Sequence, residues 1–196
     1  MKKHLLLLAT TLLLPSVAAA NNNVYITPYI GYSFTNGLSD VNGINVEAED
    51  DVHYALGLMT DLYNGRTGLY LSHQPTDFAN ITGSGSLTYA HLQSALYWET
   101  FNKATTYFGA SLGATIIDAD WSTDDLLFSA GLFGGIEFHL TQNLAVNLEG
   151  RWLASLVDSD TTTRCTLPTG EQDCNIRIDS EWMNQIQTNL GITYSF

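Results

Sequence analysis

The chain has 196 residues with 20 acidic and 7 basic side chains, so its formal net charge is −13 at pH 7. Such an acidic chain repels a phosphate backbone, which excludes nucleic acid as a partner. Beyond residue 20 no apolar run approaches the roughly twenty residues of a membrane-spanning helix. Further helical spans are therefore excluded, whereas a membrane barrel is not, because each of its strands has only a weak hydropathy signal.

The first twenty residues have the pattern of a secretory signal peptide. Lys2 and Lys3 precede an apolar run over residues 5–14, and small residues at 18–20 form a cleavage site. We expect cleavage after Ala20, which leaves residues 21–196 as a single domain. No cysteine directly follows the apolar run, so no lipid anchor is expected.

Alternation of apolar and polar residues predicts eight strands in the mature chain. Successive strand side chains point to opposite faces, so a period of two marks a strand with one apolar face and one polar face. The strands are expected at residues 24–34, 52–62, 67–74, 87–99, 104–116, 126–140, 144–157 and 181–196. The last strand alternates up to Phe196, as a strand with one lipid face and one wet face would.

The connections between these strands alternate between long and short. Long, acidic segments cover residues 36–51, 75–86, 118–125 and 158–180, and short turns cover 63–66, 100–103 and 141–143. Asn64-Gly65 is a strong hairpin signal, and pairing Leu140 with Leu144 keeps both apolar faces on one side. The predicted fold is an all-β, eight-stranded antiparallel up-and-down barrel with brief periplasmic turns and extended external loops.

Aromatic residues of the outward face collect near both expected membrane interfaces, as the girdles of membrane barrels do. The external set is Tyr32, Phe34 and Trp182, and the periplasmic set is Trp98, Phe101, Phe138, Tyr194 and Phe196. Scattered core aromatics are the alternative interpretation.

The inward faces carry charged and polar side chains that are expected to fill the lumen as a polar network. Glu149 should lie opposite Gly135, diagonal to Glu137 and two residues from Arg151. Charges in a narrow barrel must be paired or hydrated, and eight strands leave room for side chains or one small ligand. A gated path in which Arg151 exchanges carboxylate partners is the alternative. The candidate network is His91, Glu137, His139, Glu149 and Arg151, and His53, Asp61 and Glu99 face the same side.

Cys165 and Cys174 are the only cysteines, and in an exported chain they are expected to form a disulfide within the last external loop. A metal or catalytic thiol is disfavoured because no histidine lies nearby. The acidic clusters in the loops leave loose cation binding open. None of them matches a calcium-binding loop, so no metal site is expected.

Lipid-modifying chemistry would need a serine and a histidine together at the outer leaflet. Ser72 and His73 are adjacent, so their side chains should point to opposite faces of a strand. His139 and Thr141 belong to a periplasmic turn, far from outer-leaflet lipid. Neither an enzyme nor a cofactor is therefore expected.

The segment at residues 134–144, together with residues 148–152, resembles the sixth and seventh strands of small proteobacterial outer-membrane β-barrel proteins. These proteins are the opacity-protein-like relatives of the OmpA transmembrane barrel. Residues 157–160, Cys165 and residues 174–177 are similar to a cysteine-bearing loop of one subgroup. The final strand resembles the terminal signal read by the barrel-assembly machinery, carried by Leu190, Ile192, Tyr194 and Phe196.

This resemblance implies a monomer in the outer membrane of a Gram-negative bacterium, with membrane lipid, lipopolysaccharide and the assembly machinery as partners. No peptidoglycan-binding domain follows the barrel, so attachment to the wall by that route is not expected. The expected function is a structural or surface-interaction role, such as that of a surface antigen, through the acidic external loops. A small-solute channel and a lipid A-modifying enzyme are the alternatives, and the external ligand stays open.

Overall fold

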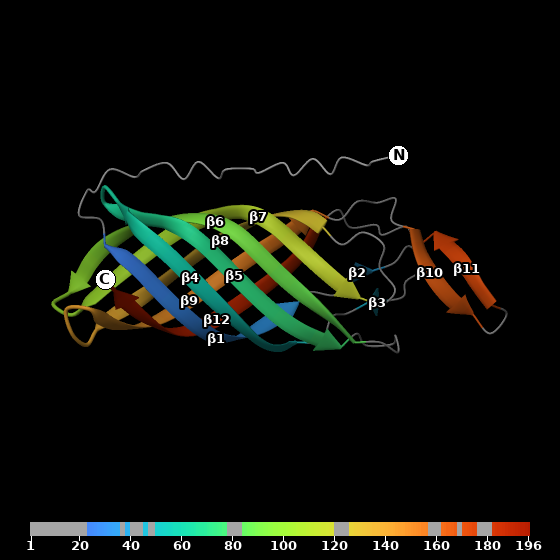
Figure 1. The fold of residues 1–196 in the computed structure, drawn as a ribbon, viewed down its shortest axis with the longest axis horizontal. Coiled ribbons are helices and arrows are strands. Elements are labelled where there is room, and N and C mark those ends of the chain that lie inside the picture. Colours follow the sequence, from blue (N-terminus) through green and yellow to red (C-terminus); the bar gives the residue numbers. More distant parts are fainter. Residues whose placement is uncertain are drawn as a thin grey trace, which may run out of the picture.

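A computed structural model of the chain describes residues 23–35, 38–39, 45–46, 50–77, 84–119, 126–156, 162–167, 170–175 and 182–196. Eight of the described strands close into one antiparallel barrel in the order β1-β12-β9-β8-β7-β6-β5-β4 (Figure 1). The predicted fold class is confirmed, and the predicted leader at residues 1–20 lies outside the described part. The barrel strands are β1 (Val24–Thr35), β4 (Asp51–Leu62), β5 (Gly65–Asp77), β6 (Ser84–Phe101), β7 (Ala104–Ala119), β8 (Leu126–His139), β9 (Leu144–Leu156) and β12 (Trp182–Ser195).

The short turns lie at the end of the barrel that carries the C-terminus (Figure 1). This end is called the periplasmic end and the opposite one the external end, after the orientation expected from the sequence. Between β4 and β5, Leu62 pairs with Gly65, so the two corner residues are Tyr63 and Asn64, with Tyr63 at φ 50°. Gly65 is required at the start of β5 because a Cβ atom there would collide with the Ala95 carbonyl of β6. Between β8 and β9, the Leu140 amide donates to the Leu144 carbonyl at 2.8 Å, which confirms the predicted register.

At the opposite end the strands extend further than the sequence predicted. β5 continues to Asp77, β6 begins at Ser84, and the ladder pairs Asp77 with Ser84. β7 likewise continues to Ala119, beyond the predicted end at residue 116. Backbone hydrogen bonds hold these extensions together and need no apolar face, so the loss of alternation did not mark the strand ends.

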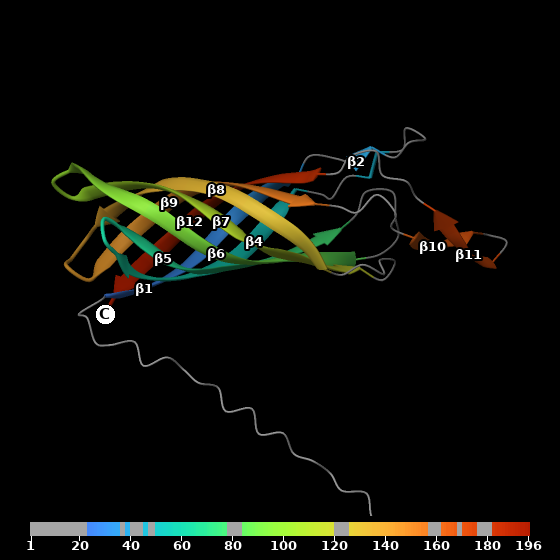
Figure 2. The same cartoon turned by 90° about the horizontal axis from the view of Figure 1, so that it is seen from above.

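Four short strands lie in segments that the sequence assigned to loops, and that assignment was wrong for these residues. β2 (Leu38–Ser39) pairs with β3 (Asn45–Val46), and β10 (Thr162–Leu167) pairs with β11 (Gly170–Asn175). The β10–β11 hairpin lies beyond the barrel end opposite the C-terminus in both views (Figures 1 and 2). Its register sets Cys165 opposite Gln172 and Cys174 opposite Thr163, so the two cysteines are diagonal on one face. Their side chains lie outside the described residues, and the disulfide stays a prediction.

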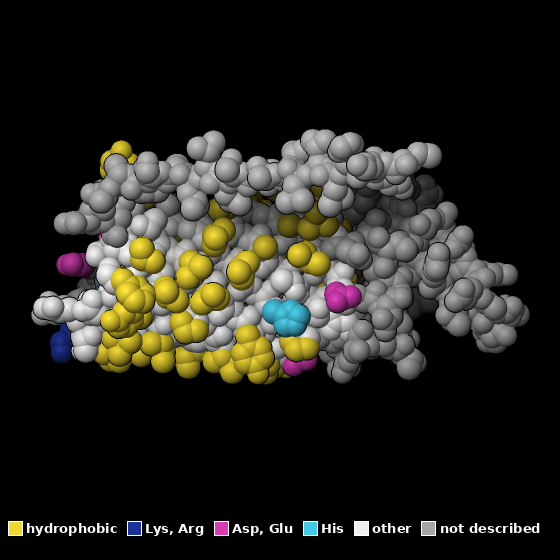
Figure 3. Space-filling model, in the orientation of Figure 1, with side chains coloured by type: hydrophobic (Ala, Val, Ile, Leu, Met, Phe, Trp, Pro, Cys, Tyr) yellow, Lys and Arg dark blue, Asp and Glu magenta, His cyan; other side chains and the backbone are white. Residues whose placement is uncertain are grey.

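Exposed apolar side chains gather over the face of the barrel that Figure 3 shows, and large hydrophobic residues are exposed on all eight barrel strands. On β6, Leu92 is 69% exposed, whereas His91 and Gln93 on either side of it are only 1% and 5% exposed. No described helix is long and apolar enough to cross a membrane. An exposed apolar band of this extent exceeds what monomeric soluble proteins tolerate, so the outward face is the surface that meets lipid. All residues predicted for the two aromatic girdles are exposed, namely Tyr32, Phe34, Trp98, Phe101, Phe138, Trp182, Tyr194 and Phe196.

Candidate functional site: the filled lumen

A cluster of apolar side chains lies inside the lumen towards its external end. Leu87 and Tyr89 of β6, Leu153 of β9 and Met183 of β12 form one buried cluster, and Ile117 of β7 packs against it. Leu87 and Leu153 are 1% and 0% exposed. Buried amides lie directly opposite two of these residues, because Gln74 pairs with Leu87 and Gln185 pairs with Leu153.

Below this apolar cluster, two histidines are held between neutral hydrogen-bonding partners. His91 Nδ1 lies 2.9 Å from Ser111 Oγ, and its Nε2 lies 2.7 Å from Ser129 Oγ. His53 is arranged in the same way between Ser33 and Asn189, at 2.8 and 2.6 Å. Both rings are buried, and their hydrogen bonds connect side chains of different strands inside the lumen.

Buried glutamine side chains form a second hydrogen-bonded group in the lumen. Gln185 donates to Gln74 at 2.8 Å, and Gln187 donates to Gln185 at 3.0 Å. Gln187 in turn accepts a 2.9 Å hydrogen bond from the Tyr70 hydroxyl. These amides are fully buried and link β5 to β12 across the lumen.

The centre of the lumen is occupied by Arg151. Its Nε donates to Glu149 at 3.1 Å and its Nη2 donates to Gln93 at 2.7 Å. The guanidinium carbon lies 3.7 Å from the Tyr70 ring centroid and 4.2 Å from that of Phe133, so aromatic rings cover the cation. Arg151 Nη1 is buried and has no hydrogen-bond partner among the described residues.

A second ion pair lies nearer the periplasmic turns. Arg66 Nη1 donates to both carboxylate oxygens of Glu137, at 2.8 and 3.0 Å. Tyr25 and Tyr97 cover the guanidinium, with ring centroids 3.6 and 4.2 Å from its central carbon. This pair is less enclosed than the central one, because the Arg66 side chain is 12% exposed.

The two ion pairs are linked through Tyr107 and Asn147. The Tyr107 hydroxyl lies 2.7 Å from Asn147 Oδ1 and 3.0 Å from Glu149 Oε2, and Asn147 Nδ2 lies 3.4 Å from Glu137. The sequence led us to expect one cluster in which Arg151 faces both glutamates. Glu149 does lie opposite Gly135. Glu137, however, forms its ion pair with Arg66, so Arg151 is paired with Glu149 alone.

The remaining predicted residues lie apart from this linked pair. His139 Nε2 lies 2.8 Å from Thr105 Oγ1 at the periplasmic end, and His91 belongs to the serine layer. Asp61 accepts hydrogen bonds from the Asn23 amide and side chain, while Glu99 is exposed on the turn side of β6. The role of the five predicted residues as a functional site stays a prediction.

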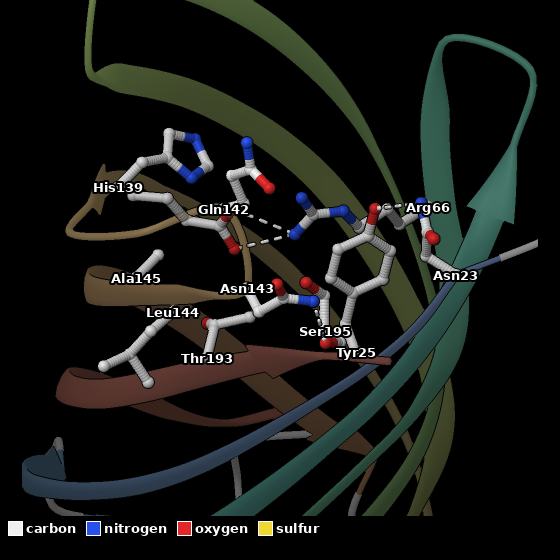
Figure 4. Close-up of a pocket in the computed structure, with 11 residues that line it drawn as sticks. Asn23, Tyr25, Arg66, His139, Gln142, Asn143, Leu144, Ala145, Thr193 and Ser195 are labelled. Atoms are coloured by element: carbon white, nitrogen blue, oxygen red, sulfur yellow. Dashed lines mark hydrogen bonds and ion pairs between the residues drawn. The ribbon is translucent and has the colours of Figure 1, made fainter.

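A polar pocket of about 280 Å³ opens at the periplasmic end (Figure 4). Arg66 and Tyr25 form one side, and His139 and Gln142 lie across from them in the figure. The Asn143 side chain donates to the Ser195 carbonyl at 2.9 Å and holds the β8–β9 turn against the end of β12. This pocket therefore opens the lumen to solvent at the end that carries the short turns. The full lining is Asn23, Tyr25, Arg66, Glu137, His139, Gln142, Asn143, Leu144, Ala145, Thr193 and Ser195.

Arg66 is the residue that sequence reasoning missed, because it was assigned to a hairpin turn. The signal that could have found it is the register of the β4–β5 hairpin. Asp61 was expected to face inward, and with Leu62 pairing with Gly65, Arg66 lies directly opposite Asp61. Directly opposed residues share a face of the sheet, so Arg66 had to point into the lumen.

The serine–histidine pairs in the described part are poorly placed for chemistry on lipid. Ser72 is buried and within 3.4 Å of Gln187, while the neighbouring His73 is exposed on the outer surface, as predicted. Ser33, Ser111 and Ser129 touch histidines, but all three are buried inside the lumen. No group of three metal-ligating side chains occurs among the described residues.

The chain matches no protein-family model and no curated protein, yet several solved structures are similar to it. Neisserial surface protein A superposes with a TM-score of 0.63 at 11% identity, over 88% of this chain and 97% of that one. Outer membrane protein OprG from Pseudomonas aeruginosa gives 0.58 at 10% identity, over 89% and 95%. Outer membrane protein AlkL gives 0.54 at 12% identity, over 100% and 97%. The shared property is the fold, which is that of a Gram-negative outer-membrane β-barrel, as the sequence predicted.

Proposed function

We propose that the protein is a non-conducting, monomeric barrel of the outer membrane that carries out a surface-interaction role through its external loops. The observation that carries this proposal is the filled lumen. From the apolar cluster at Leu87 down to Glu137, the inward side chains of successive layers are buried. An eight-stranded barrel whose interior is packed in this way has no space for a solute to pass.

The distribution of charge supports the external face as the surface that binds a partner. Most acids lie in or next to the segments that join the strands at the end opposite the C-terminus. Arg164 and Arg177 are the only basic residues there. A surface of this charge favours a cationic partner and repels an anionic one. The acids are Asp40, Glu47, Glu49, Asp50, Asp51, Asp77, Asp118, Asp120, Asp124, Asp125, Asp158, Asp160, Glu171, Asp173, Asp179 and Glu181.

Insertion of such a barrel needs a recognisable last strand, and β12 supplies an apolar face for this purpose. Leu190, Ile192, Tyr194 and Phe196 are between 45% and 68% exposed on the outer surface. We propose that these residues form the signal for the assembly machinery, so that a Phe196→Ser, Tyr194→Ser variant should accumulate outside the membrane fraction.

Planar-bilayer conductance separates this proposal from the small-solute channel that the sequence left open. The purified barrel should give no discrete current steps in potassium chloride. Regular steps from the wild-type barrel, absent when the detergent alone is added, would favour the channel instead.

Adhesion of whole cells tests the surface role. Neutralising Asp158, Asp160, Glu171 and Asp173 as their amides should weaken attachment to a polycation-coated surface. The matched control is Asp61→Asn, Glu99→Gln, which removes acids from the periplasmic end and should leave attachment unchanged. Equal effects of the two variants would contradict a role of the external face.

A further inference from the structure

The pocket at the periplasmic end has hydrogen-bonding groups that the proposed surface-interaction role does not explain. It opens on the side opposite the acidic loops, and its lining combines free hydrogen-bond donors with free acceptors. We propose that this pocket is a binding site for a small uncharged molecule rich in hydroxyl and amide groups, of about the size of one sugar unit.

Arg66 provides the fixed donor of this site. Its Nη1 is used by Glu137, and the guanidinium also interacts with the Tyr97 hydroxyl, which leaves two of its five N–H groups without a partner among the described residues. The guanidinium cannot swing away, because Tyr25 and Tyr97 cover it and Glu137 holds one nitrogen at 2.8 Å. An arginine held in this way offers a preorganised pair of donors to an oxygen-bearing ligand.

The charge of the lining decides the class of ligand. Arg66 and Glu137 neutralise one another, and the other lining groups apart from His139 carry no charge. A free anion would gain attraction from Arg66 but meet repulsion from Glu137, and a free cation would meet the reverse. A neutral molecule with several hydrogen-bonding groups avoids both costs.

The remaining polar groups suit such a molecule. Gln142 is exposed at the rim, and neither its side chain nor the Ser195 hydroxyl forms a hydrogen bond to a described residue. Asn143 uses its amide nitrogen on Ser195, which leaves its side-chain oxygen free to accept. The volume of about 280 Å³ lies just below that of sites for drug-sized ligands, so a single sugar unit fits the range.

The test is a titration of the full barrel followed by amide chemical shifts, in a micelle whose detergent carries no sugar headgroup. The probes are N-acetylglucosamine, which has hydroxyl and amide groups but no charge, and sodium acetate. We expect saturable shifts at residues 142–145 and 193–195 with the sugar and none with acetate. Absence of saturation with the sugar, or saturation by acetate at these positions, would overturn the proposal.

Two variants link any binding to the pocket. Gln142→Ala combined with Ser195→Ala removes two free hydrogen-bonding side chains without breaking an interaction that the structure shows. It should weaken sugar binding about tenfold, as the loss of two modest hydrogen bonds implies. Asn102→Ala changes an exposed amide in the neighbouring β6–β7 turn, outside the pocket, and should bind as the wild type does. Equal affinity of the double variant and the wild type would place the binding elsewhere and overturn the assignment.

Discussion

Replacing Arg151 by methionine should destabilise the barrel strongly, because it leaves a carboxylate in the closed lumen without its counter-charge. Methionine can still fill the slot between Tyr70 and Phe133, so the packing loss is small. The lost interactions are the 3.1 Å ion pair with Glu149 and the 2.7 Å hydrogen bond to Gln93. Removing one partner of a buried ion pair costs about 3–5 kcal/mol.

The matched control is the double variant Arg151→Met, Glu149→Gln. A glutamine at 149 leaves no unpaired charge and its one oxygen can keep the hydrogen bond from Tyr107 or that from Asn189, so the loss should fall to about 1–3 kcal/mol for the other bond and the missing bond to Gln93. Urea unfolding in phosphatidylcholine vesicles, followed by tryptophan fluorescence, measures both values. A single variant within about 1 kcal/mol of the wild type, or a double variant that is equally destabilised, would refute the proposed cost of the unpaired carboxylate.

Three further predictions can be checked by the same unfolding assay. Arg66→Gln should cost only about 1–3 kcal/mol, less than Arg151→Met, because water at the mouth can solvate the released Glu137; an equal or larger loss would contradict this. Gly109→Ala should cost about 1–3 kcal/mol because the new Cβ would collide with the Ser94 carbonyl oxygen and lie 2.5 Å from Phe133 Cζ, whereas Gly150→Ala, which meets nothing within 4 Å, should be neutral. Leu92→Arg on the outer surface should cost about 2–4 kcal/mol, against about 0–1 kcal/mol for Leu140→Arg at the periplasmic turn, and similar losses would argue against a lipid-facing band.

The sequence predicted the barrel well because lipid and lumen impose opposite demands on alternate residues. The outward Leu92 and inward His91 obey that demand, and the Leu140–Leu144 register follows from keeping one face apolar. Beyond the membrane neither face of a strand contacts lipid, so apolar and polar residues need not alternate there. The extension of β5 to Asp77 and the β10–β11 hairpin were therefore not predicted.

Contacts across the lumen were harder to predict than contacts along a hairpin. Glu149 and Arg151 are two residues apart on one strand, and their pairing follows from the sequence alone. Arg66 and Glu137 lie on strands that are not neighbours in the barrel and are separated by 71 residues. Their meeting depends on the tilt and stagger of the closed barrel, which local patterns do not specify.

In a membrane barrel the outward apolar face meets hydrocarbon while the inward face stays sealed from it. Spin labels placed singly at Ile30, Leu92, Leu112, Leu132 and Leu190 in lipid vesicles test this directly, with collision rates measured for dissolved oxygen and for a water-soluble nickel chelate. We predict that all five labels collide readily with oxygen and hardly with nickel. A label that is accessible to nickel, or immobilised and shielded from both reagents by other protein, would contradict the account.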